Sequence, residues 1–348
     1  MVIPATESLA EFPTPEDEER STSRRRRKDR KDKEFAGRSP LQIAMGRLRR
    51  DRVAIVCGVT VLLLVVLAVL APLINNLMQI SGTISGKYSL DGATATEFDG
   101  IPAIGPPLHD FTWDHPLGIA PGTAVDNLAR LLLGLRTSLL IATIATVIST
   151  IVGVCVGLVA GFSRGWLDRV ISFVIDLFLS FPFLLGALAI APILVDRYGS
   201  TAATLGRAQF ISLTAILVIF GWMSLARLVR GQVLSLRERE FIQAAEVIGA
   251  PTRRILFKEL LPNLVAPIVI AISLGLPTFV AAEAGLSFLG IGLTGEPSLG
   301  QIINAADGYY DQYPLYLFAP VTVVAVLVLA LNLLGDSIRD AFDPKARR

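Results

Sequence analysis

The sequence is poor in charged residues and has almost no histidine or cysteine. Asp, Glu, Lys and Arg together make up 18% of its 348 residues, whereas apolar residues make up 52%. The charged residues are clustered, which leaves long uncharged segments and indicates a polytopic membrane protein. Both cysteines, Cys57 and Cys155, lie inside such segments. Neither a disulfide framework nor a cysteine-based metal site is therefore expected.

Further absences exclude several classes of enzyme. The two histidines, His109 and His115, lie in a polar stretch without a third metal ligand, so we interpret them as loop residues. The chain contains no Gly-x4-Gly-Lys-Ser/Thr phosphate-binding loop, so it is not expected to hydrolyse ATP itself. The apolar segments carry no metal cluster and no nucleophile–base set, which disfavours a membrane-embedded enzyme. We expect a chain that is not catalytic and binds no cofactor or metal.

Six apolar segments are long enough to cross the hydrocarbon core, which takes about 20 helical residues. Each is expected to be helical, because hydrocarbon offers no partner for unpaired backbone groups. The first is too long for a signal peptide and is interpreted as an uncleaved anchor. The predicted fold is an all-α polytopic membrane protein with six transmembrane helices. The predicted spans are 53–74, 138–161, 170–193, 211–229, 265–289 and 316–335.

The distribution of Lys and Arg predicts the orientation of these spans. With the N-terminus inside, the cytoplasmic segments carry 27 Lys and Arg residues and the outer segments carry five. All six tyrosines then fall on the outer side, and four of them lie within 309–316, where an interfacial belt before the last span is expected. We therefore predict a multi-pass protein of the cytoplasmic (inner) membrane with both termini in the cytoplasm.

The chain is expected to divide into five parts. The first, 1–40, has an acidic patch and then a basic run, with too little apolar surface to offset the entropy of folding. It is interpreted as a disordered tail near anionic lipid headgroups, and not as a nucleic-acid binder, because it offers no structured readout. The others are an amphipathic segment with the first span (41–74), an extracytoplasmic loop (75–137), a core of five spans (138–335) and a cytoplasmic tail (336–348).

Small residues in the second predicted span indicate close helix packing. Gly153, Gly157 and Gly161 follow one another every four residues and share one helix face. A neighbouring backbone can approach such a face closely, so this span is expected to pack against protein and not against lipid. The spacing does not identify the neighbouring helix.

Ionisable and helix-breaking residues within the spans are candidates for pathway or polar-packing positions. Asp176 and Glu283 lie within spans without a basic partner at the same depth, and we favour polar packing over contact with a solute. Phe181 and Pro182 interrupt the third span and Pro277 the fifth, which bends a helix. Two isolated acids fit poorly with an ion-coupled secondary transporter, which needs inverted repeats and acids arranged for the ion.

The segment between the fourth and fifth spans predicts a short helix–turn–helix. Apolar residues at i, i+3, i+4 and i+7 from Phe241 form one stripe, and Gly249 then ends the helix before Pro251 starts the next. Small side chains along the stripe allow a partner to approach the backbone. From the residues alone, a docking helix and a surface helix lying on the bilayer are equally favoured. The residues assigned to the site are Glu240, Phe241, Gln243, Ala244, Ala245, Ile248, Gly249, Ala250 and Pro251.

The order of residues in this segment resembles a known family motif. Gln243-Ala-Ala is followed four residues later by Gly249 and twelve residues after that by Leu261-Pro262. This order resembles the EAA loop of bacterial ABC importer permeases, in which Glu usually stands at the position of Gln243. The resemblance implies that about 240–258 forms a coupling helix that docks in a groove on an ATPase subunit and transmits ATP-driven closure to the membrane helices.

Motifs outside this loop are similar to those of one subfamily, the DppC/OppC-type dipeptide and oligopeptide permeases, over roughly 40–344. The segment 119–126 and Leu299 depart from the usual pattern, which has an acidic, glycine-bearing segment and a Trp there. The motifs are His115–Gly118, Asn127–Leu139, Glu283–Leu293, Pro297–Gly300 and Asn332–Pro344.

The resemblance implies a type I ABC importer permease fold in which this chain forms half of the translocation pathway. The implied partners are a homologous permease of the DppB/OppB type, one or two ATPase subunits that bind ATP and Mg, and an extracytoplasmic solute-binding protein, within the membrane lipid. The implied function is ATP-driven, binding-protein-dependent import of di- and oligopeptides. Relatives that import nickel complexes, glutathione or oligosaccharides keep those cargoes open.

Overall fold

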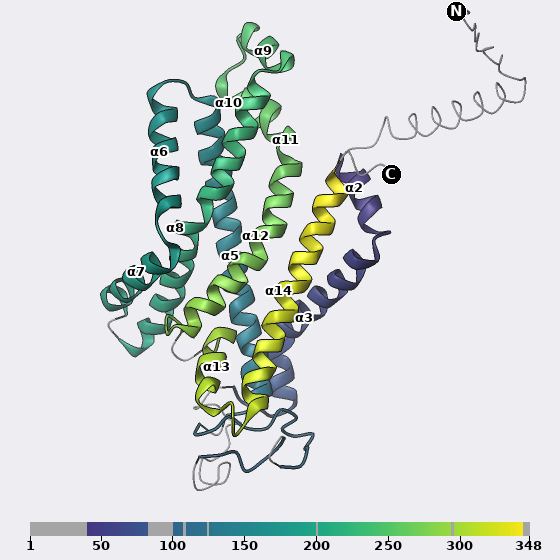
Figure 1. Cartoon of the computed structure of the whole chain (residues 1–348), viewed down its shortest axis with the longest axis vertical. Helices are drawn as coiled ribbons and strands as arrows, with labels where there is room; N and C mark the ends of the chain where they lie inside the picture. The colour runs from purple at the N-terminus through teal and green to yellow at the C-terminus, as the bar shows by residue number, and fades with distance from the viewer. Residues whose placement is uncertain are drawn as a thin grey trace, which may run out of the picture.

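The computed structural model describes residues 40–82, 100–106, 109–123, 125–199, 201–293 and 296–343. Helices dominate these residues and form an elongated bundle (Figure 1). Five of the described helices are long and apolar enough to cross a membrane. These are α3 (Arg52–Leu77), α5 (Asn127–Phe162), α8 (Ala202–Arg237), α12 (Val265–Phe288) and α14 (Pro314–Phe342).

The third predicted span is a broken helix and not a continuous one. It consists of α6 (Trp166–Ser180) and α7 (Phe183–Tyr198), which are bent by 90° relative to each other. The residue before a proline is disfavoured in the helical region, and Phe181 accordingly has an extended backbone next to Pro182. By length and composition the described chain therefore has six spans if this pair counts as one.

Several helices extend beyond the predicted spans. Helix α5 begins at Asn127, where the prediction placed 138, and α14 continues to Phe342, through most of the segment assigned to the C-terminal tail. At 1.5 Å per residue, the 36 residues of α5 or of α8 measure about 54 Å, against about 30 Å of hydrocarbon. Hydropathy detects only the part of a helix that lies in lipid, so these ends were missed.

The first and last described helices lie side by side (Figure 1). The short helix α2 (Pro40–Leu48) packs on the end of α14, where Arg47 Nη1 donates to the carbonyl oxygens of Ala341 at 3.0 Å and Asp343 at 2.8 Å. A cation at a helix C-terminus satisfies carbonyls that lack an intrahelical partner. The disordered tail predicted for 1–40 lies, except for Pro40, outside the described residues, as does 83–99 of the predicted outer loop.

Helices α5 and α8 form the central pair, and the three glycines of α5 face α8. A Cβ atom added at Gly157 would lie 2.7 Å from both the Ala226 carbonyl oxygen and Val229 Cβ. A Cβ atom at Gly161 would lie 2.6 Å from Val233 Cβ, and Gly153 meets α8 one turn further along. Such distances leave no room for a side chain. The structure thus assigns the neighbour that the spacing left open.

Candidate functional site

The helix pair between α8 and α12 stands at one end of the bundle (Figure 1). Helix α9 (Glu240–Val247) is followed by a turn and then by α10 (Thr252–Arg254), a π-helical segment (Ile255–Leu260) and α11 (Leu261–Asn263). Pro262 has no N–H to bond to the preceding turn, and the wider π-helical ladder just before it accommodates that gap. Further along, α13 (Leu299–Ala306) lies at the opposite end of the bundle (Figure 1).

Ile242 anchors α9 to the bundle. Its side chain is fully buried and packs in a cluster with Val229 and Val233 of α8 and with Ile255 and Leu260 of the returning segment. Sequence reasoning missed this residue, because a helix of eight residues with apolar side chains on two faces does not reveal which face is inward. One signal for the inward face was available. Ile242 and the small Ala245, three residues later, lie on the same side of the helix.

The opposite face of α9 is apolar and exposed. Phe241 is 44% exposed, Val247 88% and Ile248 85%, and Ala244 lies exposed among them. Of the stripe predicted from Phe241, only Ala245 turns partly inward, beside Ile242. Val247 was not among the predicted site residues. A contiguous apolar face of this kind is typical of a protein–protein contact surface.

Gly249 ends α9 in a Schellman motif. Its φ is +81°, a conformation that side-chain-bearing residues rarely adopt. The N–H of Gly249 donates to the Glu246 carbonyl oxygen at 3.0 Å, and the N–H of Ala250 donates to the Ala245 carbonyl oxygen at 3.0 Å. An added Cβ atom would meet no described atom within 4 Å. Within this chain the glycine is therefore needed for its backbone conformation, and the turn through Ala250 and the exposed Pro251 follows from it.

Polar contacts around α9 are few and lie at the surface. Gln243 Nε2 donates to the Glu238 carbonyl oxygen at 3.4 Å, and Glu240 is exposed. Arg164, in the connection from α5 to α6, lies 3.7 Å from Glu246, and both side chains are exposed. Ion pairs of this kind contribute little to stability. Apolar contacts of Ile242 hold the helix in place.

The acid in the third span has a basic partner, which corrects the prediction that it has none. Arg227 Nη2 on α8 donates to Asp176 Oδ1 on α6, and both side chains are more than half exposed. A second pair joins the same helices, with Arg230 Nε 2.7 Å from Asp168 Oδ1. Two ion pairs thus fasten α6 to α8.

Glu283 lies beside serine side chains within the packed part of α12. Its side chain is fully buried, and Ser287 Oγ donates to its Oε1 at 2.7 Å. Ser138 Oγ of α5 accepts from the Leu299 N–H of α13 at 3.1 Å, and the second carboxyl oxygen of Glu283, Oε2, has no hydrogen-bond partner among the described residues. Burial and the Ser287 contact favour the polar-packing interpretation of Glu283 over contact with a solute. Phe181, at the bend, stacks on Phe220 with ring centroids 6.2 Å apart.

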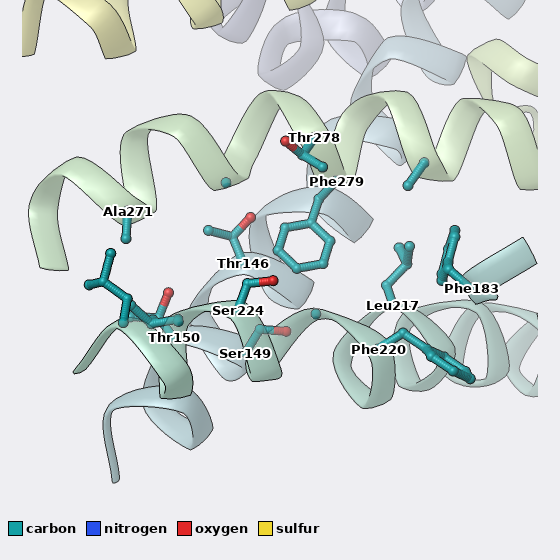
Figure 2. A pocket seen from close by; sticks show the side chains of 15 residues that line it. Thr146, Ser149, Thr150, Phe183, Leu217, Phe220, Ser224, Ala271, Thr278 and Phe279 are labelled. Atoms are coloured by element: carbon teal, nitrogen blue, oxygen red, sulfur yellow. The ribbon is translucent and has the colours of Figure 1, made fainter. Parts of the chain in front are cut away.

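A cavity of about 390 Å³ lies between α5, α8 and α12 (Figure 2). Hydroxyl side chains and phenyl rings line it, and none of its lining residues is charged. Sequence reasoning missed this cavity, although several hydroxyl residues lie in the second and fourth spans. The hydroxyl residues are Thr146, Ser149, Thr150, Ser224 and Thr278, and the rings are those of Phe183, Phe220 and Phe279.

Loop residues at the α13 end hold the start of α5 and α14 together. Asp126 caps α5 by accepting from the Ala129 N–H at 2.8 Å, and its other oxygen lies 2.7 Å from His115 Nδ1. Tyr313 donates its hydroxyl to the Leu117 carbonyl oxygen at 2.7 Å. Burial raises the pKa of Tyr313 to about 12. His115 is thus the partner of a helix cap.

Comparisons with known proteins identify the family. Residues 153–348 match the model of the binding-protein-dependent transport system inner membrane component, and 39–84 match the N-terminal transmembrane domain of oligopeptide transport permease C. The chain belongs to this family. It is therefore a permease subunit, the membrane component of a binding-protein-dependent transport system.

The relatives cover most of the permease chain. The oligopeptide transport system permease protein OppC of Mycobacterium bovis is 34% identical over 70% of this chain and 84% of its own length. The protein of the same name in Escherichia coli K12 is 32% identical over 90% of this chain and 94% of its own length. An inward-facing methionine transporter, MetNI, aligns with a TM-score of 0.49 and 23% identity over 61% of this chain and 96% of its own.

Proposed function

We propose that this permease subunit forms half of the pathway of an ATP-driven importer of di- and oligopeptides. The relatives are named as oligopeptide and dipeptide permeases, which supports a peptide cargo. The distribution of Lys and Arg supports placing α9 and both chain ends in the cytoplasm, and the α13 end outside. Under this proposal the chain lies in the inner membrane, and a paired permease supplies the other half of the pathway.

The exposed apolar face of α9 is the observation that supports the coupling role. Helix α8 continues to Arg237, about 12 Å past the predicted end of the fourth span at 229, and α9 stands at that end (Figure 1). A helix lying on the bilayer would be level with the inner ends of the shorter spans. Phe241, Val247 and Ile248 therefore present apolar surface away from lipid, as a site for an ATPase subunit requires.

The buried side of α9 supplies the mechanical connection. Ile242 packs against Val229 and Val233 of α8, and the π-helical segment joins α9 to α12. A displacement of α9 is thus transmitted to α8 through side-chain contacts and to α12 through the backbone. The partner ATPase binds ATP with Mg and hydrolyses the ATP, and the solute-binding protein delivers cargo to the α13 end.

Two matched phenylalanines test this proposal. Phe241 on α9 and Phe111 in the loop at the opposite end are 44% and 52% exposed. Phe241→Glu places a charge on the docking face without disturbing a buried contact, so we expect the ATPase subunit to be lost on purification of the co-expressed complex. Phe111→Glu makes the same chemical change, and we expect it to retain the subunit.

The readouts are the amount of ATPase that co-purifies and the ATP-dependent uptake of a labelled tripeptide into proteoliposomes. Equal recovery of the ATPase with both variants would show that α9 is not its docking site. Import of a nickel complex, glutathione or an oligosaccharide in place of the tripeptide would keep the permease role and reject the peptide cargo.

A further inference from the structure

The two long sides of the bundle both expose apolar side chains, and the side with α6 also exposes an ion pair. Helix α3 is covered in exposed apolar side chains, such as Val56, Val69 and Leu73, as expected of a lipid-facing helix. On the opposite side of the bundle (Figure 1), the ion pair Asp176–Arg227 is more than half exposed. Charged groups in spanning helices face protein or water and not hydrocarbon. The ion pair therefore marks a position on this side that protein or water covers, and α6 also exposes apolar side chains such as Phe173 and Leu177.

The cavity between α5, α8 and α12 is lined by hydroxyl groups with unused hydrogen-bonding capacity. Ser149 is 3% exposed, and its hydroxyl has no hydrogen-bond partner among the described residues. Thr146 and Thr278 donate to the carbonyl oxygens four residues earlier, which leaves their oxygen lone pairs free to accept. Buried hydroxyls without partners are costly for stability alone.

A ring beside Ser149 depends on a glycine in α8. Figure 2 shows Phe279 pointing from α12 into the cavity, above Ser149 and Ser224. A Cβ atom added at Gly221 would lie 2.3 Å from the Phe279 ring and 2.9 Å from Ser149 Oγ. The missing side chain thus makes room for the ring to lie against this hydroxyl. The cavity combines an aromatic wall with hydroxyls that can both donate and accept.

We propose that this cavity is a binding site for the uncharged, amide-bearing backbone of the cargo, with the hydroxyls of Ser149 and Ser224 as polar contacts and Phe279 as an apolar wall. A peptide group presents one N–H donor and one carbonyl acceptor, and a hydroxyl can serve either. Because no lining residue is charged, this chain contributes no counter-charge there to charged termini or side chains. The inference rests on the proposed peptide import and adds where in this chain the peptide is contacted.

Two glycines provide a matched test. An added Cβ atom at Gly275, in the cavity wall on α12, or at Gly58, on α3, meets no described atom within 4 Å. Gly275→Leu therefore fills the cavity without a backbone clash, and Gly58→Leu is the same change outside it. In proteoliposomes with the complete complex and binding protein, we expect Gly275→Leu to reduce ATP-driven uptake of labelled tri-alanine to the rate without ATP, and Gly58→Leu to leave it unchanged.

Removal of one hydroxyl gives a graded result. Ser149→Ala is expected to raise the half-saturating tri-alanine concentration about twofold to tenfold, the range of one hydrogen bond.

A third measurement does not depend on bulky side chains. In a background of Cys57→Ala and Cys155→Ala, tri-alanine should slow maleimide labelling of Ser224→Cys in the complete complex, but not of Thr60→Cys on α3.

The outcomes separate the two proposals. If the wild-type complex does not import tri-alanine, the proposed peptide function fails and the cavity assignment with it. If the wild type and Gly275→Leu import equally, the cavity assignment alone is overturned. If Gly275→Leu does not assemble, thiol protection decides, and labelling of Ser224→Cys that is indifferent to peptide overturns the assignment.

Discussion

A methyl group added at Gly157 tests the close contact between the two central helices. The new Cβ atom would lie 2.7 Å from the Ala226 carbonyl oxygen and from Val229 Cβ. The first of these belongs to the backbone of α8, so the clash is relieved only if the two helices separate. Overpacking of this kind costs about 1–3 kcal/mol.

A matched change cancels the effect of helix propensity. Gly58→Ala on α3 is also a glycine replacement within a spanning helix, and its Cβ atom meets no described atom within 4 Å. Both variants gain about 1 kcal/mol from the better helix former. We therefore expect Gly58→Ala to be slightly stabilised and Gly157→Ala to be less stable than Gly58→Ala by about 1–3 kcal/mol, the overpacking cost.

Unfolding of the detergent-solubilised chain by SDS in mixed micelles, followed by tryptophan fluorescence, measures the difference. Trp222 lies on α8, so its emission follows the unfolding of this helix. Equal unfolding midpoints for Gly157→Ala and Gly58→Ala would show that α5 and α8 do not pack at this distance. The glycine spacing would then have another cause.

Two further predictions concern pH and motion. Because burial raises the pKa of Tyr313 from 10.0 to about 12, the folded chain keeps this proton while the unfolded chain loses it; stability from this group is complete below pH 10 and falls as pH rises towards 12. A thermal midpoint in Tyr313→Phe that falls as steeply over this range as in the wild type would contradict this. In a Cys57→Ala background, spin labels at Cys155 on α5, Gly231→Cys on α8 and Gly285→Cys on α12 should show a distance change on ATP binding between α8 and α12, but none between α5 and α8. A change in the α5–α8 distance as large as that between α8 and α12 would refute it.

Hydropathy and local stereochemistry predicted much of the fold. The spans follow from long apolar segments, and the break beside Pro182 follows from the restriction that a proline places on the residue before it. The extent of the helices could not be predicted in this way, because α5 continues past the hydrocarbon to a cap at Asp126. The cap is formed by a polar side chain, and a hydropathy average does not detect such a cap.

The coupling segment shows a second limit of sequence reasoning. Its position, its length and the turn at Gly249 follow from local signals, but the inward face of α9 does not. Ile242 is buried because α8 and the returning segment supply four large apolar neighbours. These neighbours come into contact with Ile242 only when the chain has folded. The same applies to the partner of Asp176 and to the hydroxyl cavity, whose lining residues come from four separate helices.

The packing divides the bundle into parts that can move relative to each other. The glycines of α5 hold its backbone against α8 along three turns, so this pair has little freedom to separate. Helix α12 reaches α9 through the π-helical segment, and the cavity lies between α12 and the α5–α8 pair. A pull on α9 therefore acts on both walls of the cavity, through Ile242 on α8 and through the backbone on α12. Since a filled space resists such movement and a cavity does not, the hydroxyl-lined gap is where we expect the stroke of the ATPase to change the shape of the pathway.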